Sequence, residues 1–470
     1  MRFSQTSYQR MKGFNGHRSL PIGASCGPPQ SELPMTDGAQ TAQLRLVVER
    51  SITSAAGAPV EIGILRRVRP AALDRTTIRQ DCRRILDSNW VSTPGFTMPN
   101  AKSYPWQWLW DSCFHVIAWA GLGDKRAVVE LESLFALQLA NGFLPHMGYQ
   151  TNPQASLHYW HSPGRSDITQ PPMYGHALRI LAERGFQVAH LYDQADLALR
   201  YLFESRLDRG TGLLRVVHPW ETGCDDSPRW DGLRPFQGKL PHLYERRKWY
   251  ATKRALVRSL QRREGAAVYN PDFDVCSIGF NALAAFNAHE LAYLTNSEAL
   301  LEKGDELAAA IDRRWDQERT TWADVCLAGP RDSSAVRTLD SLLPVLVSKR
   351  EICTAAAFEE IFSETAFWRP FGPTGTAVDE PSYNPNWYWR GPVWPQLSYL
   401  IMLAADRHGR SHDARLAADS LIRGAVTSGF SEYWHPDTGK AKGATPQGWA
   451  TLASDALITF EGLRPRSATT

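Results

Sequence analysis

The chain has little of what would mark a membrane-bound, secreted or zinc-binding protein. No apolar run in its 470 residues approaches the roughly 20 residues of a membrane-spanning helix. Its seven cysteines are odd in number, scattered and never spaced as CxxC, which favours reduced thiols over a disulfide framework or a zinc site. A net charge of only +3 argues against nucleic acid or a membrane surface as a main partner. We therefore expect a cytoplasmic protein with no nucleic-acid or membrane partner and no cofactor.

Acidic residues are missing from the N-terminus before Glu32, and so is an apolar stretch of the signal-peptide kind. The Arg- and Ser-rich bias weakly resembles an organelle transit peptide. We favour a disordered or extended N-terminus over residues 1–34, with Met35 as an alternative first residue. Residues 35–76 are interpreted as a lead-in segment in which short strands could pair.

The chain is rich in apolar and aromatic residues. It is 43% hydrophobic and 21% charged, with 17 tryptophans and 15 tyrosines, which suits a large core and flat binding surfaces. Apolar residues recur at helical spacing over 124–142, 171–185, 193–207, 280–294, 298–315, 339–347, 395–407, 412–427 and 449–463. About a dozen helices, separated by long loops, predict an all-α fold over residues 77–465. We expect a toroid of paired helices with its functional loops at one end.

The segment from His218 to Gly232 crowds acidic residues against aromatic ones. Its carboxylates are Glu221, Asp225, Asp226 and Asp231, and its indoles are Trp220 and Trp230. Gly223 and Pro228 break any regular helix, so the segment should be a loop. Crowded carboxylates beside apolar rings have raised pKa values, and glycoside hydrolysis needs such a protonated acid at the leaving group. The alternative is an acidic surface turn whose Asp and Ser side chains cap a helix.

Aromatic residues also precede a single carboxylate near the start of the helical region. Trp106, Trp108 and Trp110 are spaced two apart and are followed directly by Asp111. Indole faces stack on pyranose rings and a carboxylate accepts sugar hydroxyls, so this segment suits a sugar site. The alternative is a buried tryptophan cluster with Asp111 capping the next helix.

Two further loops, 141–149 and 165–176, offer polar residues for the walls of such a site. These are His146, Tyr149 and Gln170. Taken singly, each of them is better explained as an ordinary loop hydrogen bonder.

The C-terminal third contains two more aromatic loops. Tyr388, Trp389 and Arg390 stand together in a segment broken by Pro and Gly. Arg390 could clamp an anionic substrate group, or pair with Asp379 or Glu380. A second loop places Glu432 between Phe430 and the pair Tyr433–Trp434, which suits a general base, although a glutamate at a helix end has the same pattern.

Five motifs in this order resemble glycoside hydrolase family 63, in particular its mannosylglycerate/glucosylglycerate hydrolase branch. They are WQWLWDSCFH, SDITQPP, ETGCDDSPRWD, YWRGPVWPQLSYLI and GFSEYWHPDTG. The resemblance covers residues 78–465. It implies an (α/α)6 barrel and an inverting mechanism that needs no metal.

The resemblance also implies roles for individual residues. By position in the motifs, Asp225 is the general acid and Glu432 the general base. Substrate-binding positions are Trp106, Trp110, Asp111, Tyr149, Gln170, Glu221, Arg229, Tyr388, Trp389, Arg390 and Gln447. Of these, Glu221 could instead be a structural neighbour of the acid, and Gln447 is expected to reach a glycerate group. In an inverting enzyme the two catalytic carboxyl groups lie roughly 6.5–9.5 Å apart, which leaves room for the attacking water.

The substrate is inferred from the basic residues of the chain. A glycerate-bearing glycoside needs a cation for its carboxylate, and Arg229 and Arg390 are candidates. Residues 234–263 add ten Lys or Arg against the single acid Glu245. We favour a solvated basic helix over a basic rim that attracts anionic substrates, with a lid over the sugar as a further alternative. We expect a hydrolase of α-glucosylglycerate or α-mannosylglycerate. The alternatives are a neutral α-glucosidase acting on disaccharides or short glucans, and a catalytically silent sugar-binding barrel. The sequence leaves the oligomeric state open.

Overall fold

The computed structural model describes residues 74–233, 235–236, 245–328 and 336–462. The predictions for residues 1–34 and for nearly all of 35–76 lie outside the described residues. The predicted helical region can be compared directly with the structure.

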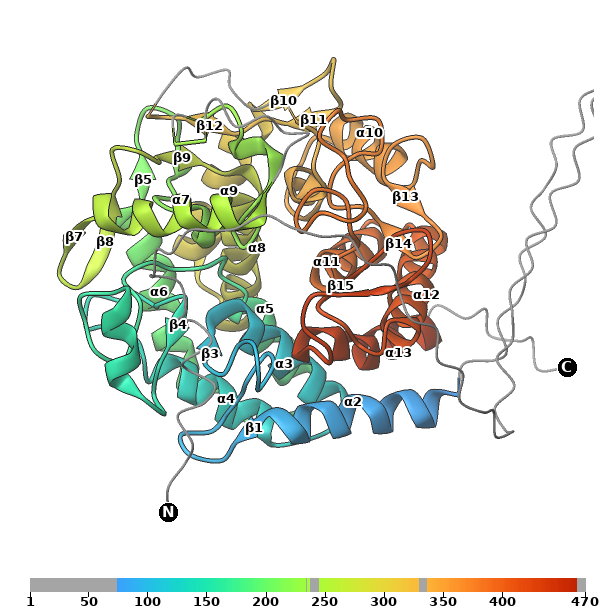
Figure 1. Cartoon of the computed structure of the whole chain (residues 1–470), viewed down its shortest axis with the longest axis horizontal. Coiled ribbons are helices and arrows are strands. Elements are labelled where there is room, and N and C mark those ends of the chain that lie inside the picture. Colours follow the sequence, from blue (N-terminus) through green and yellow to red (C-terminus); the bar gives the residue numbers. More distant parts are fainter. Residues whose placement is uncertain (1–73, 234, 237–244, 329–335, 463–470) are drawn as a thin grey trace, which may run out of the picture. The chain divides into compact units, whose positions relative to one another are not determined.

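The described chain is built mainly from α-helices joined by long loops (Figure 1). The α-helices are α2 (Arg75–Asn89), α3 (Leu109–Gly121), α4 (Arg126–Phe135), α5 (Tyr174–Glu183), α6 (Tyr192–Ser205), α7 (Arg246–Ser259), α8 (Ile278–Thr295), α9 (Glu298–Asp312), α10 (Glu351–Ile361), α11 (Pro395–Arg407), α12 (Ser411–Thr427) and α13 (Ala453–Gly462). The 3-10 helices are η1 (Pro153–His158), η2 (Ala189–Leu191), η3 (Pro219–Thr222), η4 (Pro228–Trp230), η6 (Leu339–Leu346) and η7 (Gly448–Leu452).

Most of these helices form a closed double ring (Figure 1). The inner ring runs through α3, α5, α8, η6, α11 and η7, each packed on the next, and η7 returns to α3. The outer helices α4, α6, α9, α10 and α12 follow the same order, and α2 packs on η7 and α13. The described residues thus form six helical pairs, the arrangement of an (α/α)6 barrel. The predicted fold class is confirmed.

Three predicted helices differ in detail. Residues 339–347 form the 3-10 helix η6, because Pro344 lies inside it and cannot donate an α-helical hydrogen bond. Residues 449–463 divide into η7 and α13. The helix expected over 124–142 ends at Phe135, and further on the backbone N–H of Leu139 donates to the carbonyl of Phe143 at 2.9 Å.

Strands occur only as short antiparallel ribbons within the loops of the described residues. The pairs are β1 (Trp90–Val91) with β2 (Phe96–Thr97), β3 (Gln107–Trp108) with β4 (Met147–Gly148), β5 (Leu207–Asp208) with β6 (Leu213–Leu214), β7 (Gln261–Arg263) with β8 (Ala266–Tyr269), β9 (Val275–Cys276) with β12 (Val325–Cys326), β10 (Trp315–Asp316) with β11 (Thr321–Trp322), β13 (Trp368–Arg369) with β14 (Gly372–Pro373), and β15 (Tyr433–Trp434) with β16 (Ala441–Lys442). Such ribbons stiffen the loops without forming a larger sheet.

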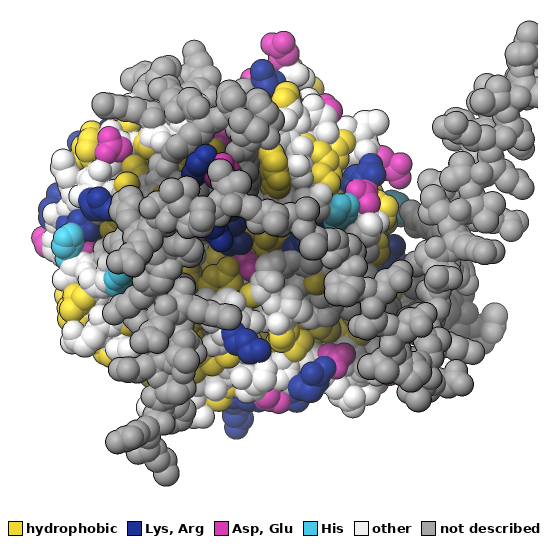
Figure 2. Space-filling model, in the orientation of Figure 1, with side chains coloured by type: hydrophobic (Ala, Val, Ile, Leu, Met, Phe, Trp, Pro, Cys, Tyr) yellow, Lys and Arg dark blue, Asp and Glu magenta, His cyan; other side chains and the backbone are white. Residues whose placement is uncertain are grey.

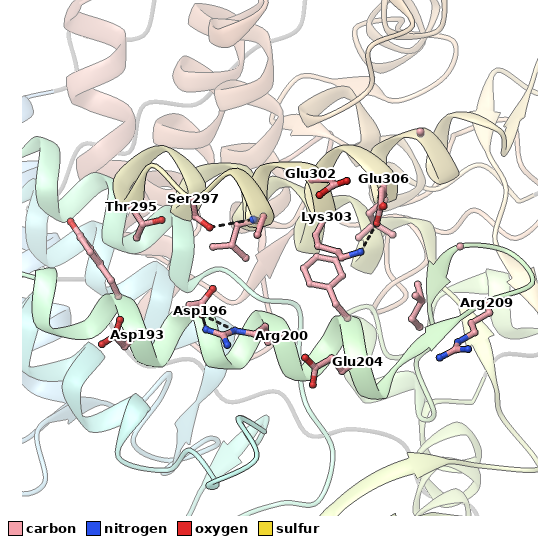
Figure 3. Close-up of a pocket in the computed structure, with 18 of the residues that line it drawn as sticks. Asp193, Asp196, Arg200, Glu204, Arg209, Thr295, Ser297, Glu302, Lys303 and Glu306 are labelled. Atoms are coloured by element: carbon pink, nitrogen blue, oxygen red, sulfur yellow. Dashed lines mark hydrogen bonds and ion pairs between the residues drawn. The ribbon is translucent and has the colours of Figure 1, made fainter.

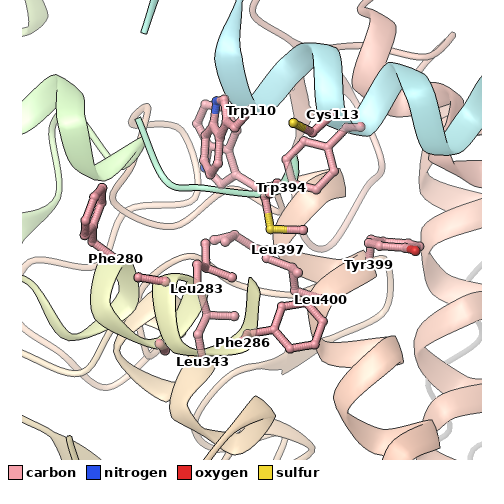
Figure 4. Packing of buried hydrophobic residues seen from close by; sticks show 14 of the residues in the cluster. Trp110, Cys113, Phe280, Leu283, Phe286, Leu343, Trp394, Leu397, Tyr399 and Leu400 are labelled. Carbon is pink, nitrogen blue, oxygen red and sulfur yellow. The ribbon is translucent and has the colours of Figure 1, made fainter. Parts of the chain in front are cut away.

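The inner helices are apolar around most of their circumference because other helices surround them. Every residue of α3 is buried, and α8 is buried along most of its length. Their side chains fill the middle of the ring: Phe280 and Leu283 of α8 face Leu397 of α11, with Trp110 of α3 nearby (Figure 4). The barrel centre is therefore a packed core.

Charged side chains of both signs are interspersed over the described part of the face in Figure 2. None of the described helices is both long and apolar enough to cross a membrane.

Candidate active site

Hydrogen bonds and ring contacts join the loops that were singled out from the sequence. The Tyr104 hydroxyl donates to Glu432, which connects the loop before α3 to the loop after α12. The backbone N–H of Trp110 donates to Gln170 at 3.4 Å. The Trp110 ring packs against Gly223 of the acidic loop, which is the segment from His218 to Gly232. Segments far apart in the sequence are therefore brought together around the start of α3.

Glu432 is buried, and its carboxylate accepts hydrogen bonds from three donors. Oε1 accepts from Tyr104 at 3.0 Å and from Tyr388 at 3.4 Å, and Oε2 accepts from the Ala444 N–H at 2.8 Å. Gly443 makes room for this arrangement, since a Cβ there would lie 2.3 Å from Oε2. The carboxylate is thus fixed in orientation.

Burial raises the pKa of Glu432 above its ordinary value. The Ala444 N–H and the Arg246 guanidinium act in the opposite direction, as do the two tyrosine hydroxyls. Because these donors favour the ionised form, Glu432 is suited to accept a proton.

Asp225 lies in the acidic loop with its side chain 24% exposed. Burial raises its pKa to about 7. The Lys253 ammonium, 3.9 Å from Oδ2, and the Arg246 guanidinium both lower the pKa. The carboxylates of Asp226 and Glu432 raise it. Asp225 therefore keeps its proton up to near-neutral pH, as a general acid must.

A buried ion pair anchors the acidic loop to the rest of the barrel. Glu221 is fully buried and accepts from the Arg206 guanidinium at 2.7 and 2.9 Å, and from the backbone N–H groups of Val217 and Thr169. These partners assign Glu221 an anchoring role, the structural alternative left open by the sequence.

Gly223 is required where the loop turns towards Asp225. Its φ is +74°, a left-handed conformation that side chains disfavour, and an added Cβ would lie 2.4 Å from the Trp110 ring. The tryptophan and the acidic loop can approach this closely only because position 223 has no side chain.

Asp111 lies in the first turn of α3 and is 3% exposed. Burial raises its pKa to about 7, with His115 lowering it and Glu432 raising it further. The charge of Glu432 thus acts on Asp111, and the predicted role of Asp111 at a sugar hydroxyl stays a prediction. Trp110 itself is buried and contacts Trp449 edge to face at 6.0 Å.

Trp106 and Tyr149 form one aromatic wall. Their ring centroids lie 4.9 Å apart, and the Tyr149 hydroxyl accepts from the Trp160 indole at 3.0 Å. They belong to a smaller apolar cluster, apart from the barrel core, in which Trp106 is only partly buried. Trp106 is therefore the member of this wall with ring surface left to contact a ligand.

The Tyr388–Arg390 segment gives each residue a different environment. Tyr388 reaches Glu432, whereas Trp389 is buried and stacks on Trp394 with centroids 3.5 Å apart. Arg390 is buried and donates to both carboxylate oxygens of Asp231, at 2.6 and 2.8 Å.

The arginines expected to bind a substrate anion are held by carboxylates of the protein. The predicted partners of Arg390 are wrong, because Asp379 and Glu380 both pair with Arg337. Arg229 is likewise buried and binds Asp324 and Asp340. Both guanidinium groups are thus paired with carboxylates of the protein.

Gln447 is buried beside this site. Its backbone N–H donates to the carbonyl of Phe430 at 2.7 Å. Its Oε1 accepts no hydrogen bond from any described residue, so it can serve a ligand hydroxyl.

Sequence reasoning did not identify three residues of this site: Tyr104, Arg246 and Lys253. The guanidinium of Arg246 lies 3.9 Å from the centre of the Tyr388 ring. Lys253 pairs with Asp226 and lies near Asp225.

A signal for these basic residues was present in the sequence. Arg246, Trp249 and Lys253 are spaced three and four apart, which puts them on one face of a helix. The segment is indeed helical, as α7, and the solvated-helix interpretation holds for exposed positions such as Arg247. It is wrong for the face that carries Trp249 and Lys253, which are buried.

A prominent cavity elsewhere does not contain the predicted site residues. It lies between α6 and α9 (Figure 3), and its Arg200 and Lys303 are paired with Asp196 and Glu306. Within the described residues, no group of three or more His, Cys, Asp or Glu side chains could hold a metal ion.

Comparison with known proteins gives consistent results. The family model described as the mannosylglycerate hydrolase MGH1-like glycoside hydrolase domain matches residues 104–450. A mannosylglycerate hydrolase of Thermus thermophilus is 29% identical over 409 residues, covering 76% of this chain and 95% of that protein. A glucosylglycerate hydrolase of Mycolicibacterium hassiacum is 27% identical over 413 residues, covering 74% and 91%.

A solved structure shows the same fold. The crystal structure of a family 63 mannosylglycerate hydrolase from Thermus thermophilus, in complex with Tris and D-glycerate, is similar with a TM-score of 0.71 and 26% identity. The match covers 82% of this chain and all of that one. Because the family model spans well over half of the chain, and five motifs lie in the expected order, the protein belongs to the MGH1-like glycoside hydrolases of family 63, which are glycosidases.

Proposed function

We propose that this glycosidase hydrolyses α-glucosylglycerate, α-mannosylglycerate or both, with inversion at the anomeric carbon. The observation that carries the proposal is the pair of carboxyl groups Asp225 and Glu432. They come from loops two hundred residues apart, influence each other electrostatically and are held in different surroundings. This asymmetry provides one proton donor and one proton acceptor.

The reaction is a single displacement. Asp225 donates its proton to the glycosidic oxygen as the bond to C1 breaks, and glycerate leaves. On the opposite face of the sugar, water attacks C1 and gives a proton to Glu432. The hydroxyls of Tyr104 and Tyr388 orient the carboxylate of Glu432 towards that water.

Arg246 supports a substrate with a carboxylate in the departing group. Its guanidinium lies against Tyr388 and affects the pKa values of both Asp225 and Glu432. No carboxylate of a described residue lies within ion-pair distance of it, in contrast to Arg229 and Arg390. Arg246 therefore replaces those two residues as the cation for the glycerate carboxylate, with the Oε1 of Gln447 as an acceptor for a glycerate hydroxyl.

Product analysis by NMR tests the proposal. The enzyme is given α-glucosylglycerate, α-mannosylglycerate and the neutral disaccharide kojibiose in separate time courses. We expect the β-anomer of the free sugar to appear first, because inversion converts an α-glycoside into a β-product. At least one glycerate glycoside should react about tenfold faster than kojibiose, a difference of about 1.4 kcal/mol. An α-configured first product would contradict inversion, and faster kojibiose hydrolysis would favour the neutral α-glucosidase.

Arg246→Gln should raise KM for the glycerate glycoside by about tenfold to a hundredfold. A charge-assisted hydrogen bond contributes about 1.5–3 kcal/mol, and glutamine keeps a polar hydrogen-bonding group, on a shorter side chain, without the charge. Hydrolysis of kojibiose should fall much less. Arg247→Gln, at an exposed neighbouring position of α7, is the matched control. Equal losses on both substrates would show that Arg246 does not act on the carboxylate.

The pH dependence of kcat/KM should be bell-shaped. Glu432 must be ionised, so activity rises with pH through its raised pKa. Asp225 must be protonated, so activity falls as pH rises through about 7. Initial rates measured from about pH 4 to about pH 9 give both limbs, which belong to the coupled pair. An activity that stays constant up to pH 9 would exclude Asp225 as the acid.

A further inference from the structure

The ammonium of Lys253 is a buried cation next to the general acid Asp225, and it has no role in the displacement described above. Lys253, in the middle of α7, has a side chain that is 3% exposed. Its ammonium donates a hydrogen bond to Asp226, whose side chain is fully buried, and lies 3.9 Å from the nearer oxygen of Asp225. One ammonium thus stands beside two adjacent carboxyl groups but binds only one of them.

Helix α7 is attached to the acidic loop at this position. Besides the Lys253–Asp226 pair, the backbone carbonyl of Lys253 accepts a hydrogen bond from His218 Nε2 at 2.8 Å. His218 begins the acidic loop, and its Nδ1 accepts from the N–H of Trp220 at 3.1 Å. The backbone and the side chain of the same lysine are therefore held by the loop that carries the acid, which fixes where its ammonium can lie.

The charges of this group favour a proton on Asp225. A Lys253 cation paired with an Asp226 anion is neutral, and so is the cluster when Asp225 is protonated. Ionisation of Asp225 would add a second negative charge in a partly buried place where the Lys253 ammonium is already bound to another carboxylate. Other charged groups that act on Asp225 are Arg246 and Glu432.

We propose that Lys253 and Asp226 are positioning residues: Asp226 holds the ammonium of Lys253 away from Asp225, so that the general acid keeps its proton between turnovers. The inference rests on the proposed function, because it takes Asp225 as the acid. Asp226 thereby has a function of its own, which its position beside Asp225 in the motif does not reveal.

The two variants should shift the acid in opposite directions. In Asp226→Asn the ammonium of Lys253 loses its anion and can bind Asp225, which favours the ionised form. In Lys253→Met the Asp226 charge faces Asp225 without compensation, which favours the protonated form. In the wild type, likewise, Lys253 lowers the pKa of Asp225 and Asp226 raises it.

The test is the alkaline limb of the kcat/KM profile for α-glucosylglycerate or α-mannosylglycerate, whichever reacts faster. Asp226→Asn should move this limb to lower pH by about one to two units, the usual effect of an adjacent opposite charge. Lys253→Met should move it to higher pH. The double variant Asp226→Asn/Lys253→Met, which removes both charges, should bring the limb back towards the wild-type position.

A second substrate separates protonation from folding. The matching α-glycosyl fluoride needs little protonation of its leaving group, so the shift of the alkaline limb in Asp226→Asn should be absent with it. A limb that stays at the wild-type position in Asp226→Asn, or that moves the same way in both single variants, would overturn the inference. If instead Asp225→Asn keeps wild-type turnover of the glycoside, the proposed function itself fails.

Discussion

Asp225→Asn should lower kcat for the glycerate glycoside by about a hundredfold to ten-thousandfold, the range that general acid catalysis supplies. Asparagine keeps the size of the side chain but has no acidic proton for the departing oxygen. The loss should be far smaller for the matching α-glycosyl fluoride, whose leaving group departs without protonation. Steady-state rates on the two substrates measure the difference directly.

The same variant should be at least as stable as the wild type, and this provides the folding control. Because the pKa of Asp225 is raised to about 7 in the folded protein from 3.8, ionisation opposes folding. The penalty is absent below about pH 4, grows between the two pKa values and is fully present above about pH 7. Thermal unfolding at pH 8 should therefore show an equal or higher Tm for Asp225→Asn. A large fall in Tm would mean that the lost activity reflects misfolding.

The fold could be predicted because local patterns carry it. The helical spacing of apolar residues predicted helices such as α5 and α11, and their observed bounds agree with the predicted ranges within a few residues. The catalytic roles of Asp225 and Glu432 rest on the residues around them in the sequence and on the resemblance to family 63, and they stay a prediction.

Long-range partners could not be predicted, since residue type does not reveal which carboxylate will lie nearest in space. Arg390 has two acids close to it in the sequence, but it binds Asp231, 159 positions away. Arg229 similarly reaches Asp324 and Asp340 across 95 and 111 positions. In a closed ring of helices, loops that are far apart in the sequence lie next to one another at one end of the barrel. The sequence pattern does not show which loops will be neighbours.

The basic segment 234–263 could be predicted only in part, for a different reason. Its many cations were interpreted as a solvated basic helix. The partners are the carboxylates of another loop, and Lys253 is buried against two of them. Composition showed an excess of charge, whereas Trp249 and Lys253, spaced four apart on one face of α7, are the positions that turn inward.

Glu432→Ala should abolish nearly all turnover of the glycoside, with a loss of about a hundredfold to ten-thousandfold. The variant removes the acceptor for the proton of the attacking water and leaves the hydroxyls of Tyr104 and Tyr388 without a carboxylate to orient. Asp225 remains able to protonate the leaving group. The defect should therefore persist with the α-glycosyl fluoride, which distinguishes the base variant from the acid variant.

Chemical rescue provides the decisive check on this role. Azide is an anionic nucleophile that needs no base, and the space freed by the missing carboxylate lies on the side from which water attacks. Sodium azide should restore part of the turnover of Glu432→Ala and give a β-glycosyl azide, which NMR identifies. Asp225→Asn, whose defect is in the leaving group, should not be rescued on the glycoside. If azide instead rescued Asp225→Asn and left Glu432→Ala inactive, the two roles would have to be exchanged, because the nucleophile enters on the side of the base and the leaving group departs on the side of the acid.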